Sequence, residues 1–144
     1  QFVQTSAYFM IMNEMIHNVR VVRMNKEHRD GPSMNWEGDS VGHWEGNTLV
    51  VDTVNFWKGT AFADSTSKMH LVEKFTRTGA DSIQYQFTIE DPTTWIAPWT
   101  AVIPMRSMDQ PIYEYACHEG NYGFHGVMAG IRRLQLEADQ GVVR

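Results

Sequence analysis

Apolar and polar residues alternate along several short segments of the chain, which is the pattern of β-strands with one buried face. The clearest case is residues 82–90, where Ile83, Tyr85, Phe87 and Ile89 occupy alternate positions and polar residues fill the positions between them. Similar runs rich in β-branched and aromatic residues predict about eight strands. The predicted strands are residues 6–16, 18–24, 40–45, 48–56, 70–77, 82–90, 99–106 and 112–117.

Glycine, asparagine, aspartate and proline gather between the predicted strands and mark the turns. Gly46 and Asn47 accept the positive φ angle of a tight turn, so residues 40–56 are expected to form a hairpin. A second hairpin is expected around a turn at residues 78–81. Longer stretches of such residues predict loops at residues 25–40 and 57–69.

Consecutive hairpins, with no strand–helix–strand unit, favour an all-β fold. We predict an antiparallel up-and-down barrel of about eight strands, lipocalin-like, forming a single domain over residues 1–144; a β-sandwich is the alternative. A barrel of this size has room inside for one small ligand. Pro104 places the seventh predicted strand at an edge or a bulge. The apolar spacing within residues 126–139 predicts a C-terminal helix.

Composition and charge narrow the classes of partner. The chain has 144 residues, 42% of them hydrophobic and 20% charged, as a globular domain has. Its net charge of −5, with no basic run, argues against nucleic acid, because phosphates would be repelled. The sequence has no run of about eighteen apolar residues that would predict a membrane helix, so a membrane is not expected as the target. The many methionines and aromatic residues favour ordinary core packing and also suit an adaptable apolar pocket. With the charge, the apolar content predicts a small apolar or aromatic molecule as the partner.

Four phrases carry a resemblance: NEMIHNVRVV, GDSVGHWEGNTLVVDTVNF, FTIEDPTTW and YEYACHEGNYG. In this order they are similar to those of a group of uncharacterised bacterial proteins that often carry an export signal and have no established activity. The resemblance covers residues from about Met12 to Gly126; it implies a periplasmic or secreted location and no particular reaction. It also implies a longer N-terminal region. Since the chain starts at Gln1 without a methionine, we expect a processed product or a fragment of a longer protein.

Glu14 and His17 form the first candidate catalytic pair. On a helix, a three-residue spacing places both side chains on one side, as in carboxylate-bridged di-iron bundles; on a strand they would point to opposite faces. A shared metal would therefore require a bend near Met15. The alternative is two unrelated residues at a solvated strand end. Arg20 is a candidate ligand-binding residue, because a guanidinium can neutralise Glu14 or bind an anionic ligand.

Two further pairs are candidates for proton transfer. His43 and Glu45 share one strand face and can act as a base and its orienting carboxylate, or as surface residues if that face meets water. Glu114 and His118 share a face of the last predicted strand. Cys117 is expected to point away from His118, so a Cys–His nucleophilic pair is not expected.

Ligand contacts are predicted for five more residues. Tyr85, Trp99 and Tyr115 are candidates for an aromatic wall, and Glu119 and Asn121 for the mouth of the cavity.

Three hypotheses about the function follow from these candidate residues. The first is an isomerase, lyase or hydrolase without a cofactor, in which a His/Glu pair moves protons in an aromatic-lined barrel cavity. The second is a carrier without chemistry. The third is a metal-dependent enzyme built on His17, His118 and nearby carboxylates, for which no tight ligand spacing is present.

The predicted strand order places these candidate residues at opposite rims of the barrel, although a shared site requires them to be together. In an up-and-down barrel, the first and third strands deliver Glu14, His17 and His43 to one rim, whereas the eighth delivers His118 to the opposite rim. The conflict disappears if Glu14 and His17 form the turn into the second strand and one strand is misassigned, or if Glu114 reaches the lumen from mid-strand.

Overall fold

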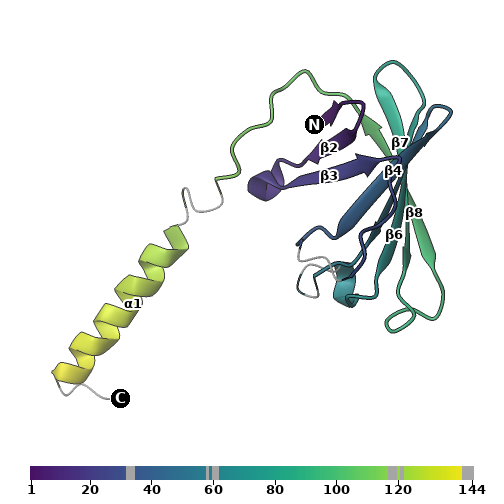
Figure 1. The fold of residues 1–144 in the computed structure, drawn as a ribbon. Coiled ribbons are helices and arrows are strands. Elements are labelled where there is room, and N and C mark those ends of the chain that lie inside the picture. Colours follow the sequence, from purple (N-terminus) through teal and green to yellow (C-terminus); the bar gives the residue numbers. More distant parts are fainter. Residues whose placement is uncertain (32–34, 58, 60–61, 117–119, 121, 141–144) are drawn as a thin grey trace. The chain divides into compact units, whose positions relative to one another are not determined.

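The computed structural model describes residues 1–31, 35–57, 59, 62–116, 120 and 122–140 (Figure 1). Two units make up the chain, residues 1–113 with all the strands and residues 114–144 with the long helix. The strands are β1 (Phe2–Gln4), β2 (Tyr8–Met12), β3 (Val19–Met24), β4 (Asp39–Glu45), β5 (Thr48–Val54), β6 (His70–Arg77), β7 (Ser82–Glu90) and β8 (Trp99–Arg106). Short 3₁₀ turns occur at Met15–His17 and Phe62–Asp64. The helix α1, Tyr122–Asp139, confirms the predicted C-terminal helix.

The eight strands form one sheet in the order in which they occur along the chain. Neighbouring strands are antiparallel except β3 and β4, which run parallel with Val22 opposite Ser40 and Met24 opposite Gly42. The all-β prediction is therefore confirmed, and the purely up-and-down connection is wrong at this one place. The reason is the long segment 25–38, which lets the chain return and place β4 parallel to the second half of β3, whereas a tight turn would force an antiparallel pair.

The sheet is strongly curled but open, so it forms a half-barrel (Figure 1). β1 and β8 are its two edges and do not pair with each other in the described part of the chain. The curl brings the rings of Phe2 in β1 and Phe75 in β6 within 5.4 Å. The closed barrel that we predicted and its alternative, the two-sheet sandwich, are therefore both wrong, because the strands form one open curled sheet. Pro104 lies in β8, an edge strand, as its missing N–H requires.

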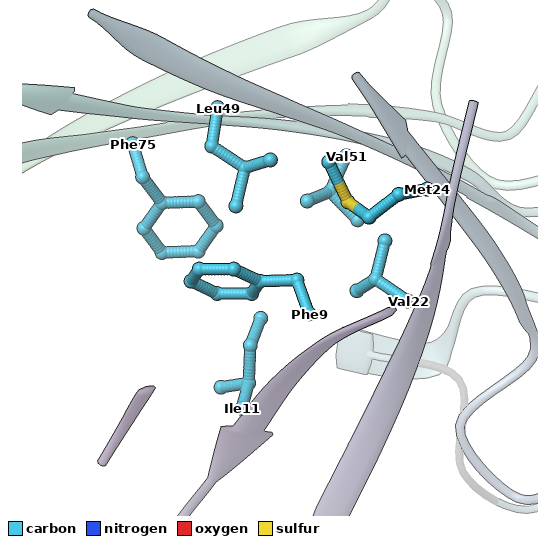
Figure 2. Close-up of a cluster of buried hydrophobic side chains, with 7 residues drawn as sticks. All are labelled: Phe9, Ile11, Val22, Met24, Leu49, Val51 and Phe75. Carbon is cyan, nitrogen blue, oxygen red and sulfur yellow. The ribbon is translucent and has the colours of Figure 1, made fainter. Parts of the chain in front are cut away.

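The main core fills the concave face of the half-barrel (Figure 2). Because side chains alternate along a strand, β2, β3 and β5 each send every second residue into it. Gly42 in β4 is needed here, since a Cβ at this position would lie 2.8 Å from Val22 Cγ1. The buried residues of this core are Phe9, Ile11, Val22, Met24, Leu49, Val51 and Phe75. Full burial of one such side chain contributes roughly 1.5–3 kcal/mol.

A second, smaller core lies along the sheet beyond the first and consists of Phe56, Met69 and Ile89. Asp91, which is 1% exposed, fixes the chain beside it. Its carboxylate accepts hydrogen bonds from the backbone N–H of Thr66 and of Thr93. The loop after β5 is thereby tied to the turn after β7.

Three local features test the predicted turns and strand ends. Gly46 has φ 61° in the β4–β5 turn, as predicted, whereas Asn47 is not among the residues with positive φ. The three-residue strand β1 was not predicted, because three residues are too few to show a period. The predicted eighth strand is wrong over residues 112–116, which are not in a strand, and Cys117 lies outside the described residues.

Candidate functional site

A groove of about 990 Å³ lies at one rim of the half-barrel. It is lined by residues of β1, β2 and the following turn, the β6–β7 turn, and β8 with the segment after it. Its apolar lining residues include Phe2, Ile11, Ile83, Met105 and Ile112. Its polar lining residues include Glu14, His17, Arg77, Asp81 and Arg106. The volume is at the upper end of the range typical of small-molecule sites.

The turn between β2 and β3 carries Glu14 and His17 into the lining of this groove. The 3₁₀ turn Met15–His17 supplies the bend that the sequence required near Met15, and the His17 N–H donates to the Glu14 carbonyl at 3.2 Å. Ile16 and His17 have φ angles of 61° and 52°. A β-branched residue in this region is strained, and such strain occurs often at functional sites. Glu14 and His17 thus form the turn into the next strand, which was one of the two ways to resolve the conflict in strand order.

Arg20, Glu73 and Tyr85 form a polar group on the concave face, in which Glu73 is buried and the other two are partly buried. The Arg20 guanidinium lies 2.7 Å from Glu73 Oε2 and donates to Oε1 at 2.8 Å. The Tyr85 hydroxyl donates to Glu73 Oε1, also at 2.8 Å. Burial, the Glu73 charge and this hydrogen bond raise the pKa of Tyr85. Arg20 therefore neutralises Glu73 and not Glu14, so its predicted role toward Glu14 is wrong.

Two residues of the predicted aromatic wall, Tyr85 and Trp99, belong to one row of packed rings on the sheet. The Tyr85 ring stacks on Phe75 at 4.7 Å and on Phe87 at 5.5 Å. Trp99 meets Phe87 edge-on at 5.6 Å and Trp95 at 5.8 Å. Tyr85 and Trp99 are half-buried in this row and do not line the rim groove in the described residues.

His43 and Glu45 contact each other as predicted, with His43 Nε2 3.2 Å from Glu45 Oε1. Their side chains are 52% and 55% exposed. Gly42, the residue before His43, faces the core, so His43 and Glu45 are on the opposite, convex face. They are surface residues outside the lining of the rim groove.

The remaining predicted residues belong to the second unit. Glu114 and Tyr115 lie in an irregular segment that precedes α1. His118, Glu119 and Asn121 lie outside the described residues. Their predicted roles therefore stay predictions.

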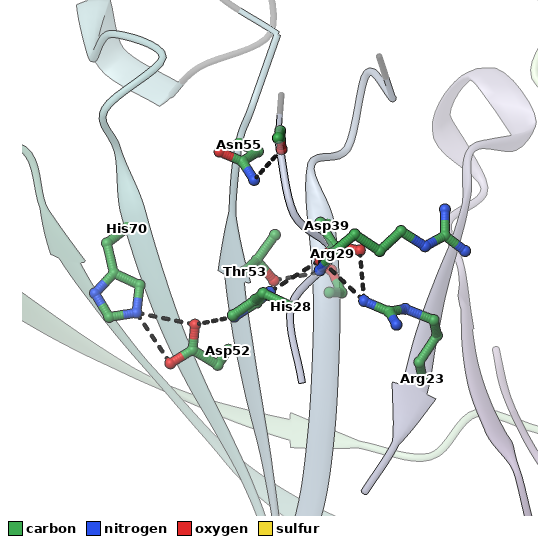
Figure 3. Close-up of polar contacts among 10 residues, drawn as sticks. Arg23, His28, Arg29, Asp39, Asp52, Thr53, Asn55 and His70 are labelled. Atoms are coloured by element: carbon green, nitrogen blue, oxygen red, sulfur yellow. Dashed lines mark hydrogen bonds and ion pairs between the residues drawn. The ribbon is translucent and has the colours of Figure 1, made fainter. Parts of the chain in front are cut away.

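The convex face carries a cluster that the sequence did not indicate (Figure 3). His28 lies between two carboxylates, with Nδ1 3.0 Å from Asp39 Oδ2 and Nε2 3.0 Å from Asp52 Oδ1. His70 in β6 reaches the same Asp52, with Nε2 3.0 Å from both carboxylate oxygens. His70 Nδ1 faces Glu90 Oε2 at 3.9 Å. We call His28, Asp52 and His70 the histidine–aspartate cluster.

Asp39 anchors this cluster to the sheet and is 3% exposed. Both of its oxygens accept hydrogen bonds from Arg23 at 2.9 Å, and one also accepts the Arg29 N–H at 2.9 Å. Burial acts to raise the pKa of Asp39, but the hydrogen bonds from Arg29, His28 and Arg23 outweigh it and lower the pKa. Asp39 is thus held as a carboxylate and fixes the segment 25–31 over the convex face.

Sequence patterns did not reveal the cluster, because its members come from three distant segments. His28 is in a loop, where side-chain direction follows no period. Asp52 and His70 are on paired strands, but the connection between those strands is long and does not fix their register. The one available signal was the occurrence of Asp52 and His70 on strands predicted to be neighbours.

Comparisons with known proteins found nothing similar: no family model, no curated protein and no solved structure matches the chain. In the described ranges, no three or more His, Cys, Asp or Glu side chains are grouped so that they could hold a metal ion. No helix in the same ranges is both long enough and apolar enough to cross a membrane.

Proposed function

We propose that this protein binds a small apolar or aromatic molecule in the rim groove, as a lipocalin-like carrier would. The observation that carries this proposal is a groove of about 990 Å³, a size within the range of small-molecule sites, whose lining combines apolar side chains with polar and charged ones. Ile11 and Ile83 extend from the core into the groove lining, so its apolar wall is continuous with the packed interior.

Adding a charge to the groove wall is expected to weaken this binding. Met105 lines the groove and is 39% exposed, so Met105→Glu adds a carboxylate to the apolar wall without disturbing the core. We expect binding of the apolar fluorescent probe N-phenyl-1-naphthylamine to weaken at least about tenfold, because the ligand would desolvate a charge. Fluorescence titration of the purified chain measures the effect.

The matched control is Val102→Glu, which places the same charge on the opposite face of β8 at a position 51% exposed. This variant is expected to bind the probe as the unchanged protein does. Equal loss in both variants, or no binding by the unchanged protein, would refute a small-molecule site in the groove.

A second candidate function is acid–base catalysis in the same groove, as an isomerase, lyase or hydrolase. It is supported by Glu14 and His17, since both line the groove and can exchange protons with a bound substrate. Both side chains are exposed, so replacing them does not disturb the core.

Replacing these two residues separates the enzyme from the carrier. If they move protons, His17→Gln and Glu14→Gln lower kcat by roughly 10²–10⁴-fold on an identified substrate. Probe binding stays within about twofold in both variants, because the apolar walls are unchanged. Full turnover in both folded variants would rule out proton transfer by this pair and leave the carrier.

A further inference from the structure

A second groove, of about 750 Å³, lies between the turn that precedes β3, β3 itself and the segment 35–38. We call it the β3 groove; its lining includes Ile16, Val19, Val21, Trp36 and Glu37. In the described part of the chain it shares no lining residue with the rim groove. We propose that the β3 groove binds an organic cation, an ammonium group on an apolar or aromatic body, with Glu37 as its counter-charge and Trp36 as its aromatic contact.

Exposed apolar side chains form the wall of the β3 groove. Val19 and Val21 alternate along the strand with the core residue Val22, so they lie on the opposite, convex face. Val21 is 50% exposed and Trp36 is 62% exposed, and Ile16 is also exposed. Apolar side chains that stay exposed next to one another are typical of a binding surface. They supply a wall for the apolar body of a ligand.

The segment that carries Trp36 and Glu37 is fixed in place. The Gly38 N–H donates to the Asn35 carbonyl at 3.2 Å and closes a turn around the two residues. Gly38 has φ 74°, and a Cβ there would lie 2.6 Å from the Val54 carbonyl oxygen, so the turn packs directly on β5. The Trp36 ring lies 4.5 Å from the ring of Trp57. A ligand therefore meets a tryptophan that is already positioned, which lowers the entropic cost of binding.

The charge of the β3 groove favours a cation. Arg20 and Glu37 are the charged residues in its described lining. The Arg20 guanidinium lies 2.7 Å from Glu73 Oε2 on the concave face, so its charge is already neutralised. Glu37 is half-buried, and its Oε1 accepts a hydrogen bond from the Asn18 side-chain amide at 2.6 Å. A carboxylate beside an exposed indole ring attracts an ammonium group both through its charge and through the face of the ring.

An NMR titration of the isotope-labelled full chain with phenethylammonium tests the proposal. Phenethyl alcohol and hydrocinnamate carry the same ring on a neutral and on a negative end. The cation is expected to bind at least about tenfold more tightly than the alcohol, because it gains a charge-assisted contact, and the anion is expected not to bind. The signals expected to shift are the Trp36 indole N–H and the Asn18 side-chain amide.

Glu37→Gln removes the charge and keeps an oxygen for the Asn18 amide. This variant is expected to bind phenethylammonium at least about tenfold more weakly and to lose the preference for the cation over the alcohol. Trp36→Ala is expected to weaken binding by about fivefold or more, because the ring contact is lost. Circular dichroism checks that both variants remain folded.

Glu45→Gln is the matched control, since Glu45 is an exposed carboxylate outside the lining of the β3 groove. It is expected to bind the cation as the unchanged protein does. Saturating N-phenyl-1-naphthylamine is expected not to compete, because the two grooves have separate linings. Equal binding of all three compounds, no binding below about 10 mM, unchanged binding by folded Glu37→Gln, equal loss in Glu45→Gln, or competition by the rim-groove probe would each overturn the proposal.

Discussion

Glu73→Ala is expected to lower the free energy of unfolding by about 3–5 kcal/mol. Glu73 is 3% exposed and accepts from both Arg20 and Tyr85. Its removal leaves the Arg20 guanidinium, 12% exposed, with no carboxylate beside it on the concave face. An uncompensated buried charge is among the few causes of destabilisation this large. Urea unfolding followed by tryptophan fluorescence measures the change.

Two companion variants show whether the buried charge is responsible. Tyr85→Phe removes only one hydrogen bond to Glu73 and is expected to cost about 1 kcal/mol. Glu45→Ala breaks the exposed pair with His43 and is expected to change stability by less than about 1 kcal/mol. If Glu73→Ala were no more destabilising than Glu45→Ala, the ion pair with Arg20 would contribute nothing to the fold.

Asp39→Asn is expected to destabilise the protein by roughly 3 kcal/mol at neutral pH, because Arg23 then loses its buried partner. The loss depends on pH. Hydrogen bonds hold the folded-state pKa of Asp39 below the 3.8 of an ordinary aspartate, even though burial opposes them. The contribution of Asp39 is therefore fully present above about pH 4 and is lost as the pH falls through the folded-state pKa.

Urea unfolding at a series of pH values measures this dependence. The difference in stability between the unchanged protein and Asp39→Asn is expected to shrink as the solution is acidified below about pH 4. Glu137→Gln, in an exposed pair on α1, serves as the control and is expected to change stability by less than about 1 kcal/mol at any pH. A difference that grew on acidification would contradict the hydrogen-bonding account of Asp39.

The rim groove and the histidine–aspartate cluster are independent features. The groove depends on the strand ends at one rim, and the cluster on the segment that joins β3 to β4. His70→Gln is expected to leave probe binding unchanged, because His70 lies outside the lining of the rim groove.

Local pattern determined β2 to β8, whereas β1 was missed and the strand predicted at residues 112–117 is wrong over residues 112–116. The alternation of Ile83, Tyr85, Phe87 and Ile89 predicted β7 and its buried face, since period-two spacing is a property of the extended chain itself. Gly46 marked the β4–β5 turn for a similar local reason, its positive φ. The helix α1 followed from helical spacing of apolar residues. Each of these predictions depended on residues within one segment.

The candidate site depended on contacts between segments, so the sequence predicted it only in part. Glu14 and His17 were found because they are three residues apart and share one turn. The pairing of Arg20 with Glu73 was missed, since the two are 53 residues apart. His28 was missed because its direction is set by Asp39 and Asp52, and not by its loop.

Tertiary structure alone decided the parallel pairing of β3 with β4 and the open edge of the half-barrel. A tight turn dictates an antiparallel neighbour, but a long connection such as residues 25–38 is compatible with either direction. What selects the direction is the sum of contacts made at a distance, including Asp39 with Arg23 and the packing of Val22 over Gly42. The spacing of apolar residues along a segment determines which side chains are buried. Which buried side chains contact one another is determined only when distant segments come together in the folded chain.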